Sequence, residues 1–241
     1  MLGKETQYMK DLRSDLSNVW RAAARLAPQN SRAIMFVSAR SGDGSTSMAA
    51  SFALLAGKRS NRNAWLVDLD LRNNNAYRGF QAGFAKGVGK PGRAYDASLG
   101  TQPIYEIYPQ TVFRRGKPAK QEKLLSAHQI ENERMMVTRF RSDRLKPAQR
   151  VHINTQPLWW NKLRKAADWI VVDAPAIERS GAGLAVASQM DGIVLVVRAD
   201  QTSAQDLTAL RREVEVHHGN IIGVAINAVG SDARLADSMI G

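Results

Sequence analysis

Residues 33–47 place an apolar strand pattern, a glycine-rich turn and the start of a helical pattern in direct succession. The run Ala-Ile-Met-Phe-Val at 33–37 suits a strand that is buried on both faces. The turn that follows contains Gly42 and Gly44. Backbone N–H groups at such a helix start are unpaired and lie at the positive end of the helix dipole, so they favour an anion. The segment therefore predicts a phosphate-binding loop.

One residue of the loop departs from the pattern G-x-G-K-[ST], which describes loops that hold ATP or ADP with Mg²⁺. Thr46 stands where the hydroxyl on Mg²⁺ is expected, but Ser45 occupies the lysine position. Removing one partner from a desolvated charge pair costs about 2 to 5 kcal/mol, so nucleotide binding should be weakened. The predicted nucleotide contacts are Gly42, Asp43, Gly44, Ser45, Thr46 and Ser47.

Strand patterns alternate with helical patterns along most of the chain, which favours an α/β fold: a doubly wound, mainly parallel sheet flanked by helices. Ser203 and Asp206 predict an N-terminal cap for one helix, and Gly219 is expected to take the left-handed conformation at its end. The further predicted strands are 64–68, 169–173, 192–197 and 221–226, and the predicted helices are about 10–27, 46–58, 156–167 and 203–218.

The chain of 241 residues suits a single large domain, here predicted over 1–241. It has no cysteine, no N-terminal signal pattern and no apolar run of the roughly 20 residues that a membrane span needs. A cytoplasmic protein is therefore expected, with no transmembrane segment. Any membrane association would come through a partner or through surface charge.

A divergent basic insertion is predicted at about 73–156, because this stretch has few continuous apolar runs and is too long for a simple loop. Residues 111–150 hold eleven Lys or Arg and four Asp or Glu, a net charge of +7 out of +12 for the chain. Such a segment could face anionic lipid, nucleic acid, an acidic polysaccharide precursor or an acidic partner, or it could simply be solvated.

Carboxylates follow two of the predicted strands and an asparagine ends the last one. Leu-Val-Asp68-Leu-Asp70-Leu-Arg follows the second strand, Val-Asp173-Ala-Pro the third, and Asn227 closes Gly-Val-Ala-Ile-Asn. In this order they resemble the deviant P-loop ATPases that include MinD, ParA and the bacterial tyrosine kinases. The closest match is the bacterial tyrosine kinases of capsule and exopolysaccharide assembly, over roughly 19–70 and 167–229.

The resemblance implies roles for these positions. Thr46, Asp68 and Asp173 would hold Mg²⁺, and Asp68 and Asp70 would be the catalytic carboxylates of an active enzyme. Asn227 matches a residue that reads adenine in relatives. The resemblance also implies a partner, the cytoplasmic tail of a membrane polysaccharide copolymerase, and leaves a homo-oligomer open.

Two departures from the family concern the chemistry. Besides the serine at the lysine position, no tyrosine follows Tyr108, whereas active kinases of the family carry a C-terminal tyrosine cluster. A third departure affects a ring-forming motif near the amino end, where this chain reads Asn18-Val-Trp-Arg21-Ala-Ala-Ala-Arg25. The leading hypothesis is therefore a catalytically degenerate kinase-like protein that regulates a polysaccharide export system.

Two alternatives remain open on the sequence. Slow ATPase or kinase activity survives if Arg40, near the extra signature lysine of MinD and ParA proteins, or a partner residue supplies the missing charge. Alternatively, the protein is a MinD- or ParA-like positioning ATPase that uses its basic segment on membrane or DNA, where Arg139, Arg141 and Arg144 would matter. Nucleic acid is the less favoured partner, and whether the protein is an enzyme stays open.

Overall fold

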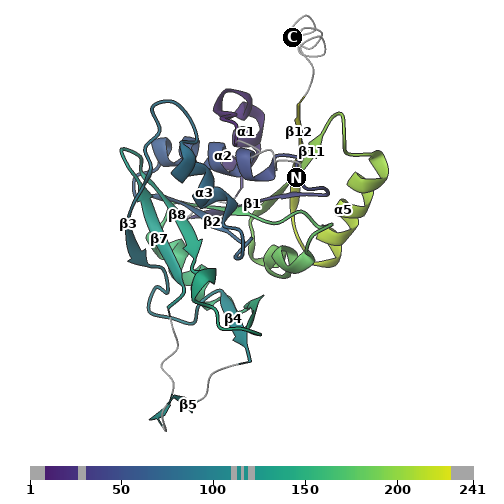
Figure 1. Ribbon diagram of the computed structural model, residues 1–241. Coiled ribbons are helices and arrows are strands. Elements are labelled where there is room, and N and C mark those ends of the chain that lie inside the picture. Colours follow the sequence, from purple (N-terminus) through teal and green to yellow (C-terminus); the bar gives the residue numbers. More distant parts are fainter. Residues whose placement is uncertain (1–8, 27–30, 110–112, 115–116, 119–122, 229–241) are drawn as a thin grey trace, which may run out of the picture.

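The computed structural model describes residues 9–26, 31–109, 113–114, 117–118 and 123–228. Its centre is an eight-stranded sheet in the order β12-β11-β1-β10-β2-β8-β7-β3 (Figure 1). The strands are β1 Arg32–Ser38, β2 Ala64–Asp68, β3 Pro91–Asp96, β7 Leu125–Ile130, β8 Met135–Phe140, β10 Trp169–Asp173, β11 Gly192–Arg198 and β12 Ile221–Asn227. Six strands, from β12 to β8, pair in parallel, which confirms the predicted fold class.

Helices cover both faces of this sheet. One face carries α1 Ser17–Ala24, α2 Ser45–Arg59 and α3 Asn75–Ala82, together with the short 3₁₀ helix η1 Arg13–Asp15. The other carries α4 Leu158–Ala166, the 3₁₀ helix η3 Gly181–Gln189 and α5 Ala204–Val216. The central strands are buried on both faces, because β-branched and aliphatic residues fill consecutive positions.

The predicted helix at about 10–27 is interrupted: η1 and α1 occupy its middle and meet at Leu16. At the far end of the chain, Ser203 and Asp206 form the predicted capping box of α5. The expectation for Gly219 is wrong. His218 takes the left-handed conformation with φ 56°, and Gly219 is required for space, because a Cβ there would lie 2.5 Å from Ile193 Cδ1.

The basic segment at about 73–156 is built into the main sheet. It supplies β8 parallel to β2, and then β7 and β3, which pair antiparallel. The segment also contains β4 Tyr105–Tyr108 with β9 Arg150–Ile153, β5 Phe113–Arg114 with β6 Lys117–Pro118, and the 3₁₀ helix η2 Ser142–Arg144. The indole of Trp159 in α4 donates to Ala97 O at 2.7 Å, which ties the segment to that helix.

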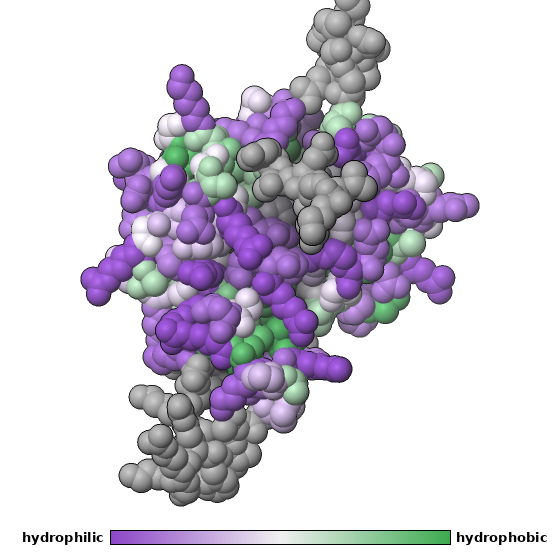
Figure 2. Space-filling view, in the orientation of Figure 1, coloured by the Kyte–Doolittle hydropathy of each residue, from purple (hydrophilic) through white to green (hydrophobic). Residues whose placement is uncertain are grey.

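The face in Figure 2 is largely hydrophilic, with small hydrophobic patches separated by polar side chains. In the described part of the chain, no helix is both long and apolar enough to cross a membrane.

Aromatic side chains pack α1 and α2 against the sheet. The ring of Phe52 in α2 is fully buried and lies within 5.6 Å, centroid to centroid, of Trp20, Phe36 and Trp169. Aromatic pairs at such distances stabilise a core beyond the area they bury.

We expect Phe52→Ala to lower the free energy of unfolding by about 3 to 5 kcal/mol, because it leaves a large cavity between α2 and the sheet. Urea unfolding followed by circular dichroism measures this change. Tyr95→Ala is the control, since that ring is 51% exposed, and it should change stability by about 0.5 kcal/mol or less. Equal losses in the two variants would contradict the packing described here.

Candidate functional site

The predicted phosphate loop joins the end of β1 to the start of α2. Gly42 and Gly44 both adopt left-handed backbone conformations, with φ values of 95° and 96°. A Cβ at Gly44 would lie only 2.2 Å from Asn227 Nδ2, so a side chain has no room there. Both glycines are therefore required by the shape of the loop.

Asp43, between the two glycines, fixes that shape from inside. Its side chain is fully buried. One carboxylate oxygen accepts from the backbone N–H of Arg40 at 3.0 Å and the other from the Thr202 hydroxyl at 2.7 Å. Its side chain thus faces the protein interior, and its backbone N–H donates to Arg40 O at 3.3 Å.

Asn227, at the end of β12, holds the loop from the next strand but one to β1. Its Nδ2 donates to the carbonyl oxygen of Asp43 at 2.9 Å, and its Oδ1 accepts from Ala228 N at 2.9 Å. The structure thus places Asn227 beside the loop. Both amide atoms are used within the chain, so its contact with adenine stays a prediction.

The three hydroxyl residues that open α2 differ in their surroundings. Ser45 is the first residue of the helix and is 9% exposed. The Thr46 side chain lies near the carboxylate of Asp173 and lowers its pKa. The Ser47 hydroxyl accepts from the backbone N–H of Lys10 at 3.1 Å, so it ties the N-terminal segment to α2. Thr46 is therefore the hydroxyl that faces the predicted metal ligands.

The predicted carboxylates come together because β10 and β2 pair in register. Asp173 lies directly opposite Asp68, and both are almost completely buried. Asp68 accepts from the backbone N–H of Asp70 at 2.8 Å and of Ala76, at the start of α3, at 2.9 Å. Asp68 therefore holds the chain turn after β2, whatever else it binds.

Asp70 lies beside this pair and already has several partners. The side-chain amides of Asn73 and Asn75 donate to its carboxylate, and the guanidinium of Arg179 forms an ion pair with it. Oδ2 receives three of these contacts and Oδ1 receives one, so most of the acceptor capacity of Asp70 is engaged within the chain.

The sequence reasoning missed Glu178 and Arg179, in the loop that follows β10. Glu178 accepts from the backbone N–H of Ser41 in the phosphate loop at 2.6 Å, and Arg179 pairs with Asp70. A charged pair several residues beyond a strand end is ordinary loop composition. It therefore gave no signal in the sequence.

Comparisons with known proteins agree with this geometry. The sequence matches no known family model and no curated protein. Solved structures do match over 91% of the chain: the VpsO kinase domain with 17% identity, TM-score 0.59 and 95% of that chain covered; and the BceF tyrosine kinase domain with 15% identity, TM-score 0.57 and 76% covered. A third is the kinase domain of the Escherichia coli tyrosine kinase ETK, with 14% identity, TM-score 0.52 and 75% covered. This chain has the fold of tyrosine kinase domains.

The carboxylates beside Thr46 form a donor set that fits Mg²⁺. Asp173 Oδ1 is buried and has no hydrogen-bond partner among the described residues. The Thr46 side chain lies near the same carboxylate, and Asp68 lies opposite it on the neighbouring strand. Mg²⁺ prefers hard oxygen ligands and commonly uses one or two carboxylates together with water and phosphate. The residues present are therefore suited to that ion.

Burial, together with neighbouring negative charge, raises the pKa values of Asp68 and Asp173. Burial, together with the charge of Asp173, raises the pKa of Asp68 well above its usual range. Burial raises the pKa of Asp173 to about 7, opposed by the Thr46 side chain and by Arg179. A nearby cation would relieve the crowding of negative charge.

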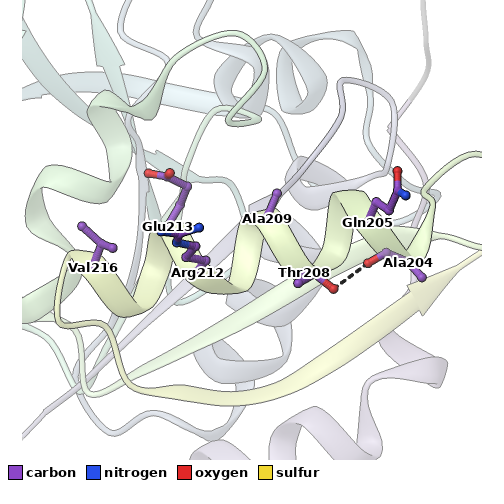
Figure 3. A pocket seen from close by; sticks show the side chains of 7 residues that line it. All are labelled: Ala204, Gln205, Thr208, Ala209, Arg212, Glu213 and Val216. Carbon is purple, nitrogen blue, oxygen red and sulfur yellow. Dashed lines mark hydrogen bonds between the residues drawn. The ribbon is translucent and has the colours of Figure 1, made fainter.

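A shallow groove runs along α5 and is distinct from the loop (Figure 3). A single helix lines it, and Figure 3 shows its side chains along one side of that helix. We assign it no ligand, because polar and small side chains alternate there without a buried charged group. The lining residues are Ala204, Gln205, Thr208, Ala209, Arg212, Glu213 and Val216.

The raised pKa of Asp173 predicts how stability depends on pH. The folded state holds this proton more tightly than the unfolded state, so stability falls as pH rises from about 4 to about 7. In metal-free buffer, we expect Asp173→Asn to gain stability relative to the natural protein over this range, by more than about 1 kcal/mol at pH 8. Thermal unfolding at several pH values in EDTA measures the difference. Asp200→Asn, in a surface ion pair with Arg198, is the control, and parallel curves for all three proteins would contradict the assignment.

Proposed function

We propose that this protein is a catalytically degenerate, tyrosine-kinase-like P-loop protein that binds Mg²⁺ with ATP or ADP weakly. It acts in exopolysaccharide or capsule biosynthesis and export, as a regulatory partner of the cytoplasmic tail of a membrane polysaccharide copolymerase. The observation that carries this proposal is a phosphate loop held in shape by Asp43 and Asn227 with Ser45 in place of the lysine.

The loop geometry supports binding. The backbone N–H groups from Gly42 to Thr46 lie at the positive end of α2 and would orient phosphate oxygens. Thr46, Asp173 and Asp68 would hold Mg²⁺, which neutralises phosphate charge when it is bound. These residues therefore suffice to place a diphosphate.

The same geometry weighs against fast phosphoryl transfer. Ser45 offers a neutral hydroxyl where the transition state requires positive charge. Asp70, one of the two predicted catalytic carboxylates, is engaged by Arg179 and two asparagine amides. Binding without rapid chemistry suits a protein that reports nucleotide state to a partner.

The regulatory role rests on the fold shared with the tyrosine kinase domains and on the resemblance of the motifs to kinases of exopolysaccharide assembly. A cytoplasmic location at the inner face of the membrane, reached through the partner, is part of the proposal. The alternative is a slow ATPase or kinase, and the carboxylates collected beside Thr46 favour it. The two functions differ in turnover.

Titration calorimetry with Mg²⁺-ADP and Mg²⁺-ATP tests the proposal on the natural protein and on Ser45→Lys. We expect the lysine variant to bind tens to thousands of times more tightly, because the new ammonium would meet the phosphates in a preformed loop. A tyrosine-peptide phosphorylation assay on the natural protein should show no transfer above background.

Two results would contradict the proposal. Equal affinities in the two proteins would show that the loop no longer receives phosphate, provided that both have the same circular dichroism spectrum. Rapid phosphorylation by the natural protein, lost in Thr46→Ala, would make it an active kinase.

A further inference from the structure

Two arginines beside the phosphate loop are candidates to supply the missing lysine charge. Arg40 belongs to the loop itself, and Arg179 belongs to the segment after β10 that runs beside it. Both arginines form ion pairs. The position of the partner carboxylate determines which of the two guanidinium groups lies toward the predicted metal site.

The guanidinium of Arg40 is directed to α5. It forms two hydrogen bonds with Asp206, at 2.9 and 3.2 Å, and Asp206 is fixed by Ser203 in the capping box. The pair with Arg40 and the bonds from Ser203 lower the pKa of Asp206 to about 2. Arg40 is thus paired with a capping residue of α5. This pair lies outside the carboxylate cluster, which consists of Asp68, Asp70 and Asp173.

The guanidinium of Arg179 is directed to the carboxylate cluster. It pairs with Asp70, whose side chain is only 11% exposed, and its charge also lowers the pKa of Asp173, the carboxylate near Thr46. Arg179 therefore lies on the side of the site where the metal and the outer phosphates would be bound.

The backbone places Arg179 there. Ile177 N donates to Ser38 O at 3.0 Å and Glu178 N donates to Ala39 O at 3.2 Å, so the segment after β10 lies along the beginning of the phosphate loop. Glu178 then caps Ser41 N with its carboxylate. Arg179 is the next residue along the chain. The contacts of Glu178 with Ser41 and Ala39 therefore fix the backbone of Arg179 beside the phosphate loop.

We propose that Arg179 is the phosphate-binding cation of this site and takes the place of the lysine that Ser45 replaces. Its ligand is the β- or γ-phosphate of a nucleoside diphosphate or triphosphate, so the inference rests on the nucleotide binding proposed above. In the free protein Asp70 holds the guanidinium in position. In the bound protein the planar guanidinium is shared between Asp70 and two phosphate oxygens, a geometry that favours arginine over lysine.

The test is calorimetric titration of the full chain with Mg²⁺-ADP. We expect Arg179→Ala to weaken binding about tenfold or more and Arg179→Lys to weaken it less. Arg40→Ala is the matched control, because it also removes an arginine in an ion pair at the loop, and it should change the affinity less than about threefold. Circular dichroism and thermal unfolding check that each variant is folded.

A second background separates a charge effect from a structural one. In Ser45→Lys the new ammonium supplies the charge, so adding Arg179→Ala should cost less than about threefold there. Asp70→Asn should strengthen binding of metal-free ADP in EDTA, because the guanidinium is no longer neutralised. The gain should disappear in the double variant Asp70→Asn/Arg179→Ala, whereas a gain that came only from removing the Asp70 charge would persist there.

Three outcomes would overturn the assignment of Arg179. They are unchanged affinity in Arg179→Ala, a larger loss in Arg40→Ala, and an equally large loss from Arg179→Ala in both backgrounds. Absence of binding in the natural protein and in Ser45→Lys would instead contradict the proposed function itself, and the Arg179 assignment with it.

Discussion

The parallel register of β1, β10 and β2 is the constraint on which the site depends. Phe36 lies opposite Asp173, and Asp173 lies opposite Asp68, so three strands end at the same edge of the sheet. The phosphate loop leaves β1 at that edge and the two carboxylates stand beside it. A shift of one residue in either pairing would turn a carboxylate to the opposite face of the sheet and separate it from Thr46.

The loop keeps its conformation through contacts that do not involve a nucleotide. Asp43 is buried against Thr202, and Asn227 holds the Asp43 carbonyl from the next strand but one. These contacts hold the loop backbone and do not involve the side chain at position 45. They therefore persist when that side chain changes. This explains how a serine at position 45 is compatible with an otherwise ordered loop.

The sequence predicted the elements whose signal is local. The central strands are continuous apolar runs, and the Ser203 cap has its partner three residues on. It did not predict β3, because that strand has no continuous apolar run and its last four residues are exposed, or its pairing with β7. The pairing of Arg179 with Asp70 was also beyond it, since that contact joins residues 109 positions apart and depends on the fold.

The central claim is that this loop still receives phosphate through its backbone. The most direct test is the amide ¹H–¹⁵N spectrum of the natural protein during titration with Mg²⁺-ADP. The account predicts saturable shifts concentrated at the amides of Gly42 to Thr46, with smaller shifts at Asp173. Shifts confined to other surfaces, or none at millimolar nucleotide, would contradict it.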